Sequence, residues 1–152
     1  MRNALVIPIG AGVISAIFHL SVTLGSPGAF VLAIFAQMPL AATGLALGIT
    51  PAAMAAAFAS LLVALGSPGV GALTLFLVTS ALPVLIIVYF GLQNREDEQG
   101  KVIWYPLGLI LAWLSLLGVM AFIAANIMFM REDGGMYGAV ENYLKSVSAA
   151  VP

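Results

Sequence analysis

Residues 11–28 read AGVISAIFHLSVTLGSPG, and residues 52–69 read AAMAAAFASLLVALGSPG. Both stretches are apolar and end in the same pentapeptide, and several Ala, Leu and Val residues coincide 41 positions apart (52 minus 11). Because Gly, Ser and Pro favour turns, we expect two successive helical hairpins of the same direction, each made of a helix, a Gly-Ser-Pro-Gly turn and a second helix. Parallel repeats of this kind are common in transporters, but short turns between any membrane helices favour the same residues.

The charges of this chain are few and unevenly placed. Its 152 residues are 62% hydrophobic and 7% charged, whereas soluble domains carry about 25% charged residues. Residues 3–94 contain no Asp, Glu, Lys or Arg. A water-soluble fold needs a charged surface, but a bilayer protein does not, since lipid tails are as apolar as its side chains. The composition therefore predicts an all-α, polytopic membrane helix bundle with the lipid bilayer as a partner.

Gly and Pro residues divide the apolar sequence into five expected transmembrane helices. Their approximate bounds are residues 4–24, 29–48, 51–65, 70–92 and 102–130. A crossing needs roughly 20 residues, so the Ala-rich helix at 51–65 is expected either to lie deep in the bundle or to thin the bilayer locally. Thr50 is its expected N-cap and Pro51 its first residue. Residues 1–130 together form the expected transmembrane bundle.

Residues 131–152 are predicted to form an extramembrane segment. Apolar residues recur there at spacings of three and four, which is typical of an amphipathic helix lying in the membrane interface. They are Tyr137, Val140, Leu144, Val147 and Val151. A frayed tail is the alternative interpretation.

The ends of the expected helices also indicate how the chain is oriented. The first apolar run is long for a signal peptide and lacks an Ala-x-Ala cleavage pattern, so we expect it to be retained as the first span. With five crossings, Arg2, Arg95 and Lys101 share one side, and Arg131 and Lys145 share the other. This bias favours a cytoplasmic N-terminus.

Few polar side chains fall within the expected helices, and four of them are candidate ligand-binding residues. Ser15, His19 and Thr23 lie at i, i+4 and i+8, on one face of the first helix, and Gln37 lies within the second. Since polar groups in a membrane usually face the bundle interior or a wet cavity, we expect these four to line a pocket between the first, second and fourth helices. The alternatives are a neutral histidine bonded to a carbonyl or to water, and an amide that joins packed helices.

Several functional classes are excluded or disfavoured by what the sequence lacks. There is no Cys, which excludes disulfides, iron–sulfur clusters and thiolate zinc sites, and a single His cannot build a metal site alone. No expected span carries a carboxylate for acid–base catalysis, so we predict a protein that is not an enzyme and has no cofactor. The net charge of −1, without a basic cluster, argues against nucleic acid as a partner.

Two stretches of the chain carry a resemblance to a known family. Residues 101–118 read KVIWYPLGLILAWLSLLG, and residues 25–65 begin GSPGAFVLAIFAQMPL. Together they resemble the DUF2232 family of bacterial membrane proteins, in which a Trp-Tyr-Pro-(Leu/Ile)-Gly element opens a helix after a charged cytoplasmic loop. The matching residues here are Trp104, Tyr105, Pro106, Leu107 and Gly108.

This resemblance implies a distant relation in fold to the substrate-binding S components of energy-coupling-factor vitamin transporters, without any substrate or catalytic residue to carry over. Members of the family continue with further membrane helices. A fragment and a shortened relative are therefore both open interpretations of this chain.

The leading functional prediction is a protein of the bacterial cytoplasmic (inner) membrane with S-component-like binding or transport of a small neutral molecule. The alternatives are a non-catalytic structural or assembly protein that packs against other membrane subunits, and a truncated fragment without independent function.

Overall fold

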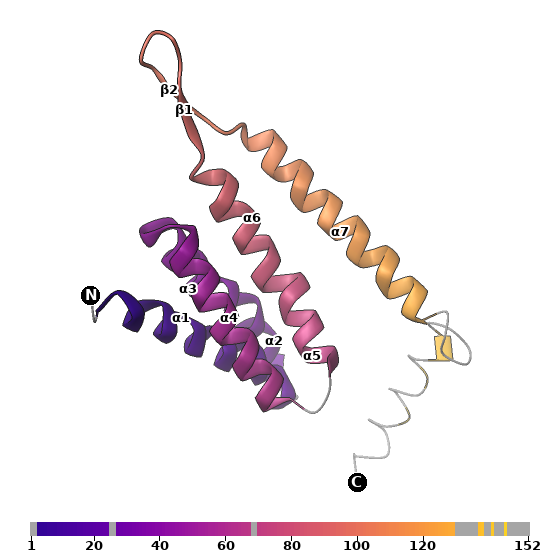
Figure 1. The fold of residues 1–152 in the computed structure, drawn as a ribbon. Coiled ribbons are helices and arrows are strands. Elements are labelled where there is room, and N and C mark those ends of the chain that lie inside the picture. The colour runs from indigo at the N-terminus through magenta and orange to yellow at the C-terminus, as the bar shows by residue number, and fades with distance from the viewer. Residues whose placement is uncertain are drawn as a thin grey trace. The chain divides into compact units, whose positions relative to one another are not determined.

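The computed structural model describes residues 3–24, 27–67 and 70–129, together with residues 137–138, 141 and 145. These residues are mostly helical, as the sequence predicts (Figure 1). The chain divides into two compact units, Met1–Leu114 and Ser115–Pro152. The helical repeat and the candidate residues Ser15, His19, Thr23 and Gln37 lie in the first unit.

The first hairpin consists of α1 (Asn3–Leu20), the 3₁₀ turn η1 (Ser21–Leu24), α2 (Pro27–Phe35) and α3 (Gln37–Leu47). The Ser21 hydroxyl closes its turn: it donates to the carbonyls of Phe18, at 2.6 Å, and of Ala29, at 3.1 Å. The first LGSPG stretch therefore lies where one helix ends and the next begins, as predicted.

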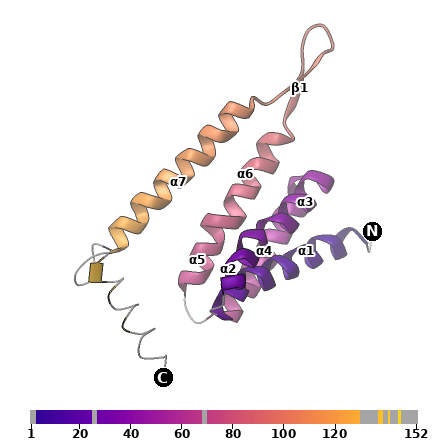
Figure 2. The same cartoon turned by 180° about the vertical axis from the view of Figure 1, so that it is seen from behind.

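The second hairpin repeats this order with α4 (Ile49–Gly66), α5 (Val70–Phe76), the π-helical segment η2 (Leu77–Ala81) and α6 (Leu82–Gly91). α4 is the central helix of the unit, since it packs against α1, α3, α5 and α6 (Figure 2). At 18 residues α4 is longer than the predicted helix at 51–65 and is long enough to cross a membrane. It packs through one face, while Met54, Phe58, Leu61 and Leu65 are exposed.

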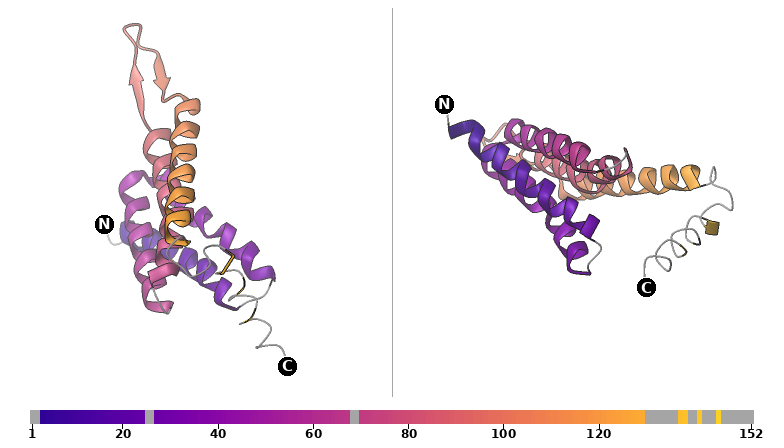
Figure 3. Two further views of the ribbon diagram at one scale, coloured as in Figure 1. Left: turned by 90° about the vertical axis from the view of Figure 1, so that its right-hand side faces the viewer. Right: turned by 90° about the horizontal axis from the view of Figure 1, so that it is seen from below.

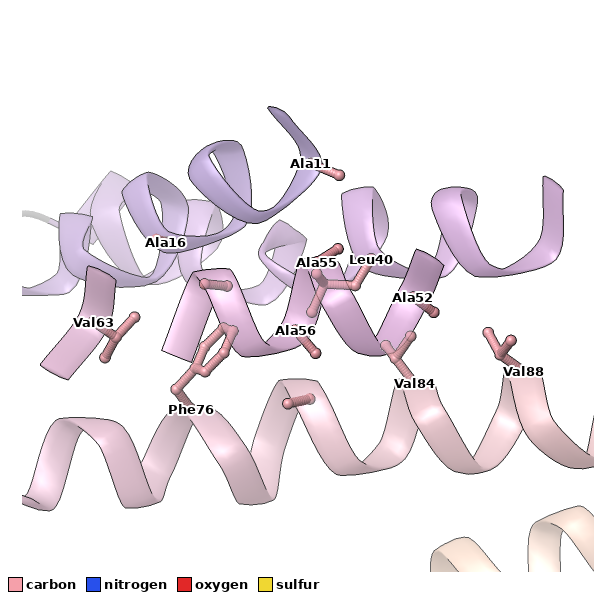
Figure 4. Close-up of a cluster of buried hydrophobic side chains, with 12 residues drawn as sticks. Ala11, Ala16, Leu40, Ala52, Ala55, Ala56, Val63, Phe76, Val84 and Val88 are labelled. Atoms are coloured by element: carbon pink, nitrogen blue, oxygen red, sulfur yellow. The ribbon is translucent and has the colours of Figure 1, made fainter. Parts of the chain in front are cut away.

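The core is built around the small residues of α4. Its buried positions are Ala52, Ala55, Ala56, Ala59 and Val63, and Leu40, Phe76, Val84 and Val88 pack around them from the neighbouring helices (Figure 4). Apolar helices gain little from burial when the solvent is itself apolar. Small side chains let the backbones approach closely, so that dispersion contacts hold the helices together.

The start of α4 differs from the prediction. Thr50 is not an N-cap, because α4 begins at Ile49, and Pro51 is its third residue. The turn between α3 and α4 is made by Gly48, which has φ 98° and ψ 179° and donates its N–H to the Gly44 carbonyl at 2.8 Å. This backbone conformation is essentially confined to glycine.

The Gly48→Ala substitution should therefore lower the free energy of unfolding by about 1–3 kcal/mol, because a Cβ strains the turn although the space around it is open. Thermal unfolding in detergent measures the loss. Gly71→Ala, at an equally open helical position without a positive φ, is the matched control. Equal midpoints for the two variants would show that Gly48 is not conformationally required.

The fifth predicted helix begins later than expected. Val102–Trp104 is a strand, β2, which pairs antiparallel with β1 (Asn94–Glu96), and α7 runs from Leu107 to Phe129 (Figure 3). Val, Ile and Trp are good strand formers, and Pro106 has no N–H to place inside a helix. The turn closes through Gly100, at φ 75°, whose N–H donates to the Asp97 carbonyl at 2.8 Å.

Three described helical stretches are long and apolar enough to cross a membrane: Ile49–Gly66, Gly71–Gly91 and Leu107–Ile127, with mean hydropathies of 1.9, 2.4 and 2.4. Leu5–Leu20 and Val31–Leu47 are apolar but shorter. Five crossings therefore remain a prediction. Most of the predicted amphipathic segment lies outside the described residues; within it, Lys145 and Glu141 form an exposed ion pair at 2.7 Å.

Candidate functional site

The second helix of each hairpin is interrupted near its middle. The break between α2 and α3 falls at Ala36, and Pro39 is the third residue of α3. In the second hairpin, η2 interrupts the helix just before Pro83, the second residue of α6. Proline has no N–H for the carbonyl four residues earlier, and its ring crowds that carbonyl. A break or a π-bulge relieves this conflict.

The two interruptions begin at corresponding positions of the repeat, although the prolines that follow them, Pro39 and Pro83, are 44 residues apart (83 minus 39) rather than 41. Ala36 is shifted by the repeat length onto Leu77 (36 plus 41), which is the first residue of η2. The correspondence is approximate, because the first interruption is a single residue with helical dihedral angles and the second is a π segment of 5 residues. In transporters with internal repeats, interrupted helices at corresponding positions of the two halves commonly form the substrate site.

Ser15 connects α1 to the first interruption. Its side chain is fully buried, and its hydroxyl donates to the Ala36 carbonyl at 2.5 Å, across 21 residues of sequence. By contrast, the hydroxyls of Thr43, Ser60 and Thr79 donate to carbonyls four residues earlier in their own helices. Such local bonds satisfy a hydroxyl without involving a partner helix. The Ser15 hydroxyl differs from them because its bond joins two separate helical segments.

His19 connects the same face of α1 to the helix before the second interruption. Its ring meets that of Phe76 edge-on, with centroids 5.0 Å apart and planes at 70°. The backbone of Ala72 lies close to the imidazole. Ala72 and Phe76 both belong to α5, and Phe76 directly precedes η2. One face of α1 therefore contacts both interrupted helices.

The other two predicted site residues are less clearly part of this arrangement. Gln37 is the half-buried first residue of α3, directly after the break at Ala36. Thr23 lies in η1, and its side chain is outside the described residues. The structure thus brings Ser15 and His19 to the interruptions, while a pocket lined by all four residues stays a prediction.

Ser15 and His19 are enclosed by their neighbours. Ser15 is 0% exposed and His19 is 7% exposed, and Phe76, at 0%, covers the imidazole. Two hollows of this unit lie elsewhere: one of about 330 Å³ is lined by Ile9, Met54, Ala57, Phe58 and Leu61, and one of about 350 Å³ lies at the base of the β-hairpin. The α1 face is therefore closed in this structure.

Sequence reasoning missed Phe76 and the Ala36 carbonyl. Pro39 and Pro83 lack the N–H groups that would bond the carbonyls four residues earlier, those of Phe35 and Thr79. Phe35 is next to Ala36, but no sequence signal marks Phe76. Among the described residues, no three His, Asp or Glu side chains gather in a way that could hold a metal ion.

The chain matches no family model, no curated protein and no solved structure. The resemblance to the DUF2232 family accordingly rests on the residues quoted above for it. Any function must be argued from the site itself.

Proposed function

We propose that this chain is a multipass protein of the bacterial cytoplasmic membrane that binds a small neutral molecule for transport, in the manner of an S component. The observation that supports the proposal most is the pair of corresponding helix interruptions joined by the Ser15 and His19 face of α1. Two further apolar helices, Leu5–Leu20 and Val31–Leu47, are shorter than the three membrane-crossing stretches. In this proposal they also cross the membrane, which gives five crossings and a cytoplasmic N-terminus.

The chemistry of this face favours a neutral ligand. Residues 3–94 carry no Asp, Glu, Lys or Arg, and a buried charge is costly unless it is paired. What the site offers is a hydroxyl, an imidazole, a carbonyl at the break and the apolar ring of Phe76. Such a mixture of a few polar groups in an apolar setting is typical of small-molecule sites.

Ligand access requires a local movement, since the site is closed. Phe76 covers His19 and lies directly before the π-helical segment. Single-turn π segments inside helices are frequent at functional sites, and η2 is where α5 can move relative to α6. In the proposed cycle, Phe76 moves away from His19 and admits water or the ligand.

The alternative is a structural or assembly protein, and one observation favours it. Ser15 and His19 already have partners inside the unit, the Ala36 carbonyl and the Phe76 ring. In addition, Ile9, Met54, Phe58 and Leu61 line an outward apolar groove. In that case the polar face only fixes helix packing and never becomes accessible to water.

A cysteine-accessibility experiment separates the two functions, because the chain contains no Cys. The Ser15→Cys thiol should react with a water-soluble methanethiosulfonate reagent at least about tenfold faster than the Ile14→Cys thiol, since only a hydrated thiol forms the reactive thiolate. Ile14 is the adjacent, outward-facing position of α1 and serves as the matched control. Rates are measured on the full chain in proteoliposomes.

Equally slow reaction of both thiols would refute the transport proposal and support the structural alternative. If the Ser15→Cys thiol does react, neutral compounds that both slow its labelling and raise the thermal unfolding midpoint of the protein identify the ligand class.

A further inference from the structure

The hollow at the base of the β-hairpin has a composition unlike that of the rest of the first unit. It has a volume of about 350 Å³ and is lined by Gln93, Asn94, Arg95, Ile103, Trp104, Tyr105 and Pro106. It thus combines two amides, two aromatic rings and a guanidinium. Arg95 is the only charged residue among the seven.

The base of the hairpin is held in place by backbone and ring contacts. β1 and β2 pair with Asn94 opposite Trp104, and the Tyr105 N–H donates to the Gln93 carbonyl at 3.0 Å. The Phe90 ring of α6 contacts Tyr105, with centroids 4.8 Å apart, and stacks on Trp113 at 5.8 Å. The hollow is therefore fixed at the end of α6 and is not a feature of the hairpin tip.

The charge in this hollow is available for an anion. Within the described part of the chain, no carboxylate pairs with Arg95. Three acidic residues, Glu96, Asp97 and Glu98, follow it, but none of them lines the hollow. A guanidinium offers a rigid fork of donors that matches phosphate oxygens, and the neighbouring amides of Gln93 and Asn94 add neutral donors.

The surface beside the hollow is strongly apolar. Trp104 is 59% exposed, and Leu107, at the start of α7, is 76% exposed. The apolar stretch Leu107–Ile127 begins here, so the hollow lies where a membrane-crossing helix would leave the hydrocarbon. Trp and Tyr are enriched at this level of a bilayer. A ligand that fits both surfaces has a phosphate at one end and a hydrocarbon chain at the other.

We propose that this hollow binds the phosphate group of a glycerophospholipid, with Arg95 holding the phosphate and an acyl chain lying along Leu107. The site is distinct from the α1 face, and its occupation does not depend on transport. The same phosphate chemistry could come from a free anion in solution. The apolar surface beside the hollow favours the lipid.

The test uses the full chain in detergent, with phosphatidylglycerol as the probe and native mass spectrometry as the readout. Arg95→Gln should weaken lipid retention about tenfold, since a bond to a charged group is lost. Lys101→Gln removes the same charge from the same loop at a residue that does not line the hollow, and it should leave retention unchanged. Arg95→Lys, which keeps the charge but loses the fork, should give an intermediate value.

Equal retention of phosphatidylglycerol by the wild type and by Arg95→Gln would overturn the proposal. Equal losses of the lipid in Arg95→Gln and Lys101→Gln would also overturn it, because they would indicate only a general effect of loop charge. Inorganic phosphate at the concentration of the lipid should not displace phosphatidylglycerol. Displacement by phosphate alone would show that the source is a free anion and would refute the lipid. None of these outcomes depends on the labelling of the Ser15→Cys thiol.

Discussion

Phe76→Ala should be among the most destabilising single substitutions in this chain, lowering the free energy of unfolding by about 2–3 kcal/mol through the cavity that it leaves. Phe76 is fully buried, and its ring points at α4 between Val63 and Ala56 (Figure 4). Most of the loss is packing, because the transfer of an apolar side chain from lipid to a protein interior contributes little. The same variant should uncover His19.

The neighbouring substitution Leu75→Ala is the matched control, because Leu75 belongs to the same helix but is 55% exposed. Thermal unfolding of the two variants in the same detergent measures the difference. A loss in Leu75→Ala as large as that in Phe76→Ala would mean that α5 is not packed as described, and the closed site at His19 would lose its cover.

Gly12→Leu should destabilise the bundle by about 3 kcal/mol, near the upper end for overpacked sites. A Cβ at Gly12 would lie 2.7 Å from the Ala55 carbonyl oxygen and 3.2 Å from the Ala59 nitrogen. Both atoms are backbone, so no side chain can move aside and α1 must separate from α4. Because α1 carries Ser15 and His19, this separation should also raise the reactivity of a Ser15→Cys thiol in the double variant.

Gly10→Leu adds the same side chain two residues earlier in α1, at a position where a Cβ meets nothing within 4 Å. It should change the unfolding midpoint little, so that the difference between the variants isolates the contact of α1 with α4. The two leucine variants are compared by thermal unfolding and by size-exclusion chromatography in detergent. If Gly10→Leu were as damaging as Gly12→Leu, leucine at these positions would disturb α1 itself rather than its packing.

Much of the architecture could be predicted from local features of the sequence. Gly-Ser-Pro-Gly ends a helix wherever it occurs, because these residues favour turns and oppose helix continuation. The presence of two successive helical hairpins could be predicted from the two copies of LGSPG, which lie 41 residues apart. The strand Val102–Trp104 was missed because three apolar residues next to a long apolar helix fit either structure, and only the pairing with Asn94–Glu96 decides between them.

The candidate site was predictable only in part. The spacing of Ser15 and His19 placed both on one face of α1, since residues four apart are neighbours on a helix. The partners of that face could not be read from the same pattern. The Ala36 carbonyl and Phe76 lie 21 residues from Ser15 and 57 residues from His19 (76 minus 19), and neither carries a polar side chain that would mark it.

The sequence by itself determined the composition-dependent properties of this protein: an apolar chain without charge over residues 3–94, broken into helices by Gly and Pro, and arranged as a repeat. These depend on the chemistry of each residue and of its near neighbours. Only the tertiary structure decided which helices meet, that Gly12 touches the backbone of α4, and that Ser15 and His19 connect two interrupted helices. Such contacts depend on how closely whole helices can approach, and that distance is set by packing across the bundle.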